Sequence, residues 1–141
     1  MKVELLDVTI YEDDGWTWRT ERIRNPSWDE VEAAIRRLDR FRYPFVWLFQ
    51  NADVEDVALP EFNVMGGEGE FALEYGPNGT ESCYFDPARG DHEIEIWRSD
   101  QGAVREAKYC CPSLDAVLRA TRYFCEHGRL DPSLSWQSLP E

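Results

Sequence analysis

The stretch Leu59-Pro-Glu-Phe-Asn-Val-Met-Gly-Gly-Glu-Gly-Glu-Phe-Ala-Leu-Glu-Tyr75 decides the fold. Apolar and polar residues alternate on both sides of its glycines, which is the side-chain period of a β-strand. Glycines between two such runs are typical of a hairpin turn. The stretch therefore predicts two antiparallel strands joined at Gly66-Gly67. A phosphate-binding loop is disfavoured, because the lysine of a P-loop and the following helix are both missing.

The elements around this hairpin predict an α+β fold. Further strands are expected over residues 3–11, 16–19, 45–49, 83–85 and 93–97, and more weakly over 104–109. Ser27 and Glu30 have the spacing of a capping box and open a helix that should run to about Phe41. Ser113 opens a second helix, for which Gly128 is a natural end. We expect an antiparallel or mixed sheet of six to eight strands with two helices packed on one face.

The size and composition predict one domain spanning residues 1–141. Residues 1–24 should form an N-terminal hairpin, and residues 129–141 an irregular tail in which Leu134 and Trp136 pack back on the domain. The longest apolar run, Phe45–Phe49, is too short to cross a membrane and should be a central strand buried on both faces. The N-terminus lacks the apolar region of a signal peptide, so we expect a cytoplasmic protein.

The charge is strongly acidic and unevenly distributed. The net charge is −13, and residues 50–97 alone hold twelve acidic residues and one basic residue, Arg89. This balance disfavours nucleic acids and anionic membranes as partners, because both carry negative charge. The excess charge either serves solubility over several loops or forms a binding surface.

Strand alternation places a subset of these acids on one predicted face. If Phe71, Leu73, Ile94 and Ile96 point inward, their neighbours point outward. The candidate partner-binding residues are Glu68, Glu70, Glu74, Glu93, Glu95 and Trp97. A tryptophan among carboxylates is a plausible anchor for a basic partner. The alternative is that Trp97 lies under the tail or the second helix.

Residues that could carry catalysis are few. The two histidines, His92 and His127, lie in an acidic turn and at a helix end, and Cys83, Cys110, Cys111 and Cys125 lack metal-binding spacing. We expect buried or half-buried free thiols and no metal or cofactor. The arginines late in the first helix, Arg36, Arg37, Arg40 and Arg42, are explained by the negative helix end.

The order of motifs from residue 26 to 136 resembles immunity protein family one of bacterial polymorphic-toxin systems. The resemblance rests on the Ser-Trp-Asp-Glu-Val-Glu helix start at Ser27, the Asn63–Phe71 hairpin, Gln101-Gly102, Phe124-Cys-Glu-His-Gly128 and Trp136. A neighbouring family of uncharacterised bacterial domains has a similar pattern. In the immunity family, the glycine hairpin and the late tryptophan belong to the framework. The resemblance implies tight binding and inhibition of a cognate toxin domain, without catalysis.

Three functions follow as hypotheses. The first is an immunity or inhibitor protein whose acidic sheet face binds a basic toxin domain. The second is a small enzyme that uses His92 with nearby carboxylates. The third is a homodimer paired through an exposed sheet edge.

Overall fold

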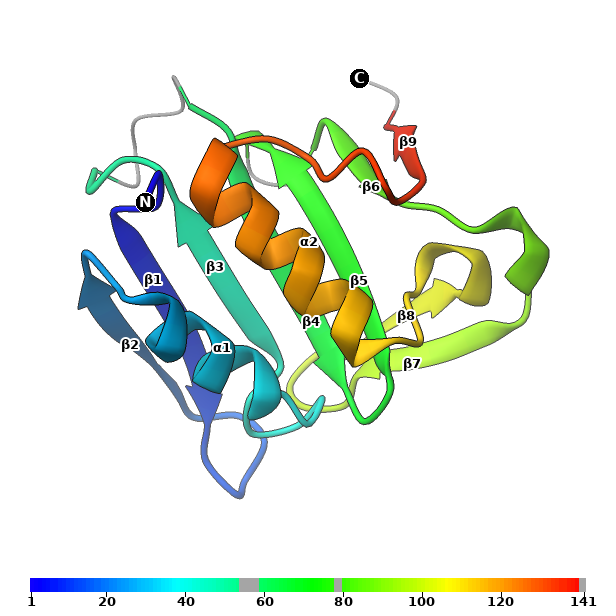
Figure 1. The fold of residues 1–141 in the computed structure, drawn as a ribbon. Helices are drawn as coiled ribbons and strands as arrows, with labels where there is room; N and C mark the ends of the chain where they lie inside the picture. The colour runs from blue at the N-terminus through cyan, green and yellow to red at the C-terminus, as the bar shows by residue number, and fades with distance from the viewer. Residues whose placement is uncertain (54–58, 78–79, 140–141) are drawn as a thin grey trace.

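The computed structural model describes residues 1–53, 59–77 and 80–139. Within these residues, seven antiparallel strands form the main sheet in the order β2-β1-β3-β4-β5-β6-β9, and β7 and β8 form a second sheet. Two helices, α1 and α2, lie together on one face of the main sheet (Figure 1). We call this the helical face and the opposite one the back face. The expected α+β fold with both helices on one face is confirmed. The strands are β1 (Leu5–Tyr11), β2 (Trp18–Arg24), β3 (Phe45–Phe49), β4 (Glu61–Gly67), β5 (Glu70–Gly76), β6 (Ser82–Tyr84), β7 (Glu93–Trp97), β8 (Ala103–Glu106) and β9 (Trp136–Ser138).

The first helix, α1 (Trp28–Arg36), begins as predicted and ends earlier than predicted. Ser27 and Glu30 form the expected capping box. The helix stops at Arg37 because the Asp39 carboxylate accepts hydrogen bonds from the backbone N–H groups of Phe41 and Tyr43, at 3.0 and 2.9 Å. This side-chain bonding offers the backbone a turn in place of another helical residue. The segment after Arg37 therefore leaves the helix and runs along the end of β4.

The second helix, α2 (Leu114–His127), has the predicted ends. The Ser113 hydroxyl accepts from the Ala116 N–H, and Gly128 takes the left-handed conformation with a φ of 72°. The inner stripe of α2 and the buried side of α1 pack on Leu6, Val8, Val46, Leu48, Phe62, Val64 and Leu73 of the main sheet. No helix among the described residues is long and apolar enough to cross a membrane.

The central strand β3 is buried on one face only. Val46 and Leu48 are fully buried beneath the helices, whereas Phe45, Trp47 and Phe49 are half-buried on the back face. The prediction that this strand is buried on both faces was therefore wrong for three of its five side chains. The strand is central, as predicted, because it pairs with β1 and β4.

The hairpin β4–β5 forms, and its turn lies two residues later than predicted. Gly67 still pairs with Glu70, so the turn consists of Glu68 and Gly69, both with positive φ, as in a type I′ hairpin. Gly66 and Gly67 belong to β4. They are needed for close approach, since a Cβ on Gly67 would lie 2.4 Å from the Leu38 carbonyl oxygen.

The C-terminal tail adds a strand to the sheet. Leu134 and Trp136 pack on the core as predicted, but residues Trp136–Ser138 form β9 at the edge next to β6, which corrects the expectation of a wholly irregular tail. The Trp136 ring contacts Phe62 and Tyr84, and its indole N–H donates to the Asp131 carbonyl at 2.8 Å.

The second sheet covers one part of the back face. Strand β7 contacts β4 and β5. A small cluster of Ala72, Ile96 and Cys110 fills the space between the two sheets. The molecule thus has three layers where β7–β8 lies over the main sheet, and two elsewhere.

Candidate functional site

The six candidate residues do not share one exposed face. Glu70 and Glu74 lie on the back face of β5, Glu93 and Glu95 project from the outer surface of the second sheet, and Trp97 points inward. The predicted surface was wrong in this respect. The alternation along each strand was correct, but β5 and β7 belong to different sheets. The back-face side chains of β5 therefore lie beneath the second sheet, whereas Glu93 and Glu95 of β7 lie on its outer surface.

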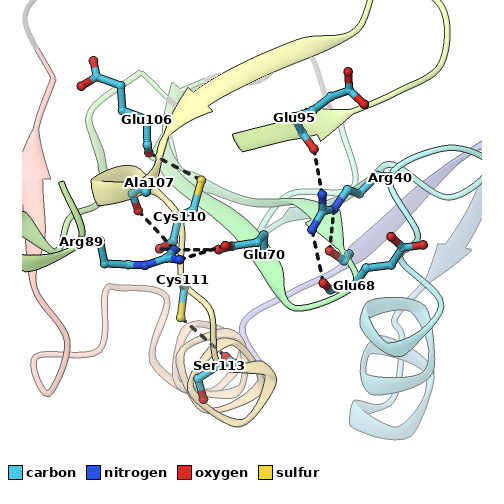
Figure 2. A network of polar contacts seen from close by, with 11 residues as sticks. Arg40, Glu68, Glu70, Arg89, Glu95, Glu106, Ala107, Cys110, Cys111 and Ser113 are labelled. Atoms are coloured by element: carbon cyan, nitrogen blue, oxygen red, sulfur yellow. Dashed lines mark hydrogen bonds and ion pairs between the residues drawn. The ribbon is translucent and has the colours of Figure 1, made fainter. Parts of the chain in front are cut away.

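Glu70 is held by an arginine. Arg89 donates to both carboxylate oxygens of Glu70, at 2.6 and 2.9 Å, and also to the carbonyls of Cys110 and Ala107, at 2.8 and 3.3 Å (Figure 2). The Glu70 side chain is only 17% exposed. Through these bonds Arg89 connects the main sheet at Glu70 with the segment after β8, so Glu70 has a structural explanation.

Trp97 is turned inward by a β-bulge. The register between β7 and β8 shifts between Glu95 and Trp97, so Ile96 and Trp97 both face the main sheet. The indole ring packs edge-on against Phe45 at 4.7 Å, and its N–H donates to Ser99 Oγ at 2.8 Å. The ring is therefore half-buried against β1 and β3, and not under the tail or α2.

Arg40 and Glu68 form a second set of polar contacts between the two sheets. Arg40 is buried and donates to the carbonyls of Gly67, Glu95 and Glu68 at 2.8, 3.0 and 3.3 Å (Figure 2). The interpretation of Arg40 as helix-end charge was wrong, because α1 ends before it. The Glu68 side chain is exposed and pairs with Arg98 at 3.3 Å.

The outer surface of the second sheet is acidic. Glu93 lies directly opposite Glu106, and Glu95 directly opposite Val104, so these four side chains share one face. The Glu95 and Glu106 side chains are 64% and 43% exposed, and Val104 is an exposed apolar residue among them. We call Glu93, Glu95, Val104 and Glu106 the acidic hairpin face. The sequence interpretation missed Val104 and Glu106, although reading 93–106 as a hairpin would have found them.

A pocket of about 210 Å³ lies on the back face, between β5 and β6 and the segment that follows β8. We call it the Glu74 pocket. Its lining includes Ala72, Glu74, Cys83, Arg105, Tyr109 and Leu139. Burial raises the pKa of Glu74, and Arg105 opposes that shift. Burial also raises the pKa of Cys83, with a smaller contribution from Glu74. The sequence placed Glu74 on an open surface and gave no sign of this pocket.

The remaining titratable candidates are dispersed. His92 and His127 are exposed, and the His127 ring lies 4.3 Å from that of Tyr123. The four cysteines are free and buried, as expected. Burial raises the pKa of Cys110 to about 11 and of Cys125 to about 12, so these thiols are protonated at neutral pH. In the described ranges, no three His, Cys, Asp or Glu side chains are arranged to hold a metal ion.

No family model matches this chain, and no curated protein matches it either. The resemblance to immunity protein family one stays a prediction that rests on the order of motifs. Two acids of the charged segment, Glu55 and Asp56, lie outside the described residues. The acidic hairpin face and the Glu74 pocket are two surface features of the described residues that the packing of the fold does not explain.

Proposed function

We propose that the protein is an immunity or inhibitor protein that binds a basic toxin domain through the acidic hairpin face. The observation that carries this proposal is the direct cross-strand pairing of two carboxylates, Glu93 and Glu106. Like charges directly opposite each other on a sheet destabilise it. A basic partner would relieve that repulsion, so the pair suits a bound state better than a free one.

The neighbouring cations leave much of this charge uncompensated. Lys108 lies 3.3 Å from Glu106 and 2.7 Å from Asp91, so one cation serves two carboxylates. Arg98 pairs with Glu95 at 3.1 Å, and also with Glu68. Exposed pairs of this kind contribute little and are readily exchanged for others. The net charge of −13 adds a long-range attraction for a basic domain.

The exposed apolar residue of the acidic hairpin face, Val104, favours a role in binding over a role in solubility. Val104 is 50% exposed and lies opposite Glu95 in the hairpin. An interface commonly places apolar contact at its centre and charge at its rim. The acidic hairpin face has this arrangement on a small scale.

The test begins with the gene neighbourhood. If the adjacent upstream gene encodes a large secreted protein, its C-terminal domain is the candidate toxin. Co-expression in a bacterial host should restore growth that this domain alone arrests, and the two proteins should co-purify. A toxic domain that neither binds this protein nor is neutralised by it would contradict the proposal.

A further inference from the structure

The Glu74 pocket combines apolar walls with two charged groups of opposite sign. Ala72, Tyr109 and Leu139 supply the apolar part of the lining, and Glu74 and Arg105 supply the charge. The volume of about 210 Å³ suits a single side chain better than a large ligand. Ala72, Glu74 and Arg105 line it from strands β5 and β8, whereas Tyr109 and Leu139 lie in the segments that follow β8 and β9.

The Glu74 carboxylate lacks hydrogen-bond donors. Its side chain is only 27% exposed, and the nearest nitrogen of Arg105 lies 3.8 Å away, too far for a hydrogen bond. Arg105 instead donates to the Val104 carbonyl at 3.1 Å. Among the described residues, the carboxylate therefore has one loose ion pair, with Arg105, and accepts no hydrogen bond.

A buried acceptor beside Glu74, Asn63 Oδ1, lacks a hydrogen-bond donor among the described residues. Asn63 of β4 lies directly opposite Glu74 of β5, so both side chains are on the back face. Asn63 is 9% exposed, and its buried Oδ1 accepts no hydrogen bond within the described part of the chain. Buried acceptors of this kind are normally paired. This part of the back face thus holds a buried acceptor without a donor, next to a carboxylate whose cation lies beyond hydrogen-bond distance.

We propose that the pocket receives a lysine or arginine side chain of the partner, with its cationic end on Glu74 and its stem against Tyr109 and Leu139. This inference rests on the proposed function and names the contact that would anchor it. Arg105 and Glu106 are neighbours on β8, so the pocket and the acidic hairpin face lie on opposite sides of one strand. A partner that contacts both the pocket and the acidic hairpin face would bind on both sides of strand β8.

The inference is tested without the toxin, by NMR titration of the methyl groups of Ala72 and Leu139. The probes are the Nα-acetyl methylamides of lysine, arginine, norleucine and glutamate. Lysine or arginine should give saturable shifts, whereas norleucine and glutamate should not. Equal shifts with norleucine would overturn the inference, because the site would then select only an apolar stem.

Three variants sharpen the titration. Glu74→Gln should abolish the saturable shift, and Glu126→Gln, on the distant surface of α2, should retain it. Arg105→Gln should tighten binding about threefold, because it removes the competing cation. A residue with only a structural role would not give this increase. Unchanged binding in Glu74→Gln, with the remaining spectrum intact, overturns the inference.

The titration separates the two proposals. Binding of a toxin domain without any response to the cationic probes would overturn the pocket and leave the proposed function standing. A response to the probes with no toxin binding would overturn the proposed function, and with it the assignment of the pocket to a partner's side chain.

Discussion

Arg40 links three carbonyl groups that belong to different parts of the molecule. Its guanidinium bonds the Glu68-containing turn of the main sheet and strand β7 of the second sheet. Arg40→Met would leave these acceptors without their charged donor and should lower the free energy of unfolding by about 3 kcal/mol. Urea denaturation measures this. Arg36→Met, which removes only an exposed i,i+4 pair with Glu32, should cost about 0.5 kcal/mol. Equal losses would contradict the linking role.

Two glycines of the hairpin separate close packing from turn conformation. A Cβ on Gly67 would meet the Leu38 backbone, whereas one on Gly69 would meet nothing within 4 Å. Both have positive φ. Gly69→Ala should therefore cost about 1 kcal/mol from backbone strain alone, and Gly67→Ala at least about 3 kcal/mol, because overpacking is added. Thermal unfolding of the two variants tests this, and a similar loss in both would contradict the packing explanation.

The raised pKa of Glu74 makes the stability depend on pH with a defined sign. Its pKa lies above the ordinary value of 4.5, chiefly through burial. The folded protein therefore binds this proton more tightly than the unfolded chain does. That stabilisation is present below the ordinary value and is lost as the pH rises through the folded-state value.

Glu74→Gln should remove this dependence, because the amide stays neutral. Relative to the native protein, the variant should gain stability between acidic and neutral pH. The free energies of unfolding of the native protein and the variant are compared from about pH 4 to about pH 7, where a carboxyl group with a raised pKa titrates. Two curves that stay parallel would contradict the predicted sign.

At the scale of elements, the C-terminal strand is a test of how the sheet is completed. Trp136 joins β9 to the core through Phe62 and Tyr84. Trp136→Ala should lower the free energy of unfolding by about 3 kcal/mol. Trp16→Ala, at a side chain that is 71% exposed, should change it by less than about 0.5 kcal/mol. The measurement is chemical denaturation. An equally small loss of stability in Trp136→Ala and Trp16→Ala would show that the tail is not part of the cooperative unit.

The elements show what the sequence could predict. Both helix starts were predictable because capping is local, as at Ser27 and Ser113. The strand of residues 93–97 was also predictable from its alternation. Its membership of a second sheet was not, because pairing depends on residues far along the chain. The bulge that turns Trp97 inward leaves no clear mark in the alternation either.

At the scale of the whole molecule, the layered arrangement decides which charges can reach a partner. Covering β5 with the second sheet removes Glu70 and Glu74 from the open surface and leaves Glu93 and Glu95 on the outside. The sequence predicted the acidic segment and two of the four residues of the acidic hairpin face, Glu93 and Glu95. It could not predict the pocket, which exists only where Arg105 and Tyr109 approach β5 and β6.

The acidic hairpin face is tested most directly by affinity for the candidate toxin domain. A triple variant, Glu93→Gln with Glu95→Gln and Glu106→Gln, is compared with Glu12→Gln, Glu21→Gln and Glu126→Gln, which make the same charge change elsewhere. The hairpin variant should bind about tenfold more weakly and the control nearly as the native protein does. Raising the salt concentration should slow association of the native protein and reduce the difference in affinity between the two triple variants. Equal affinities of the two variants would contradict the account.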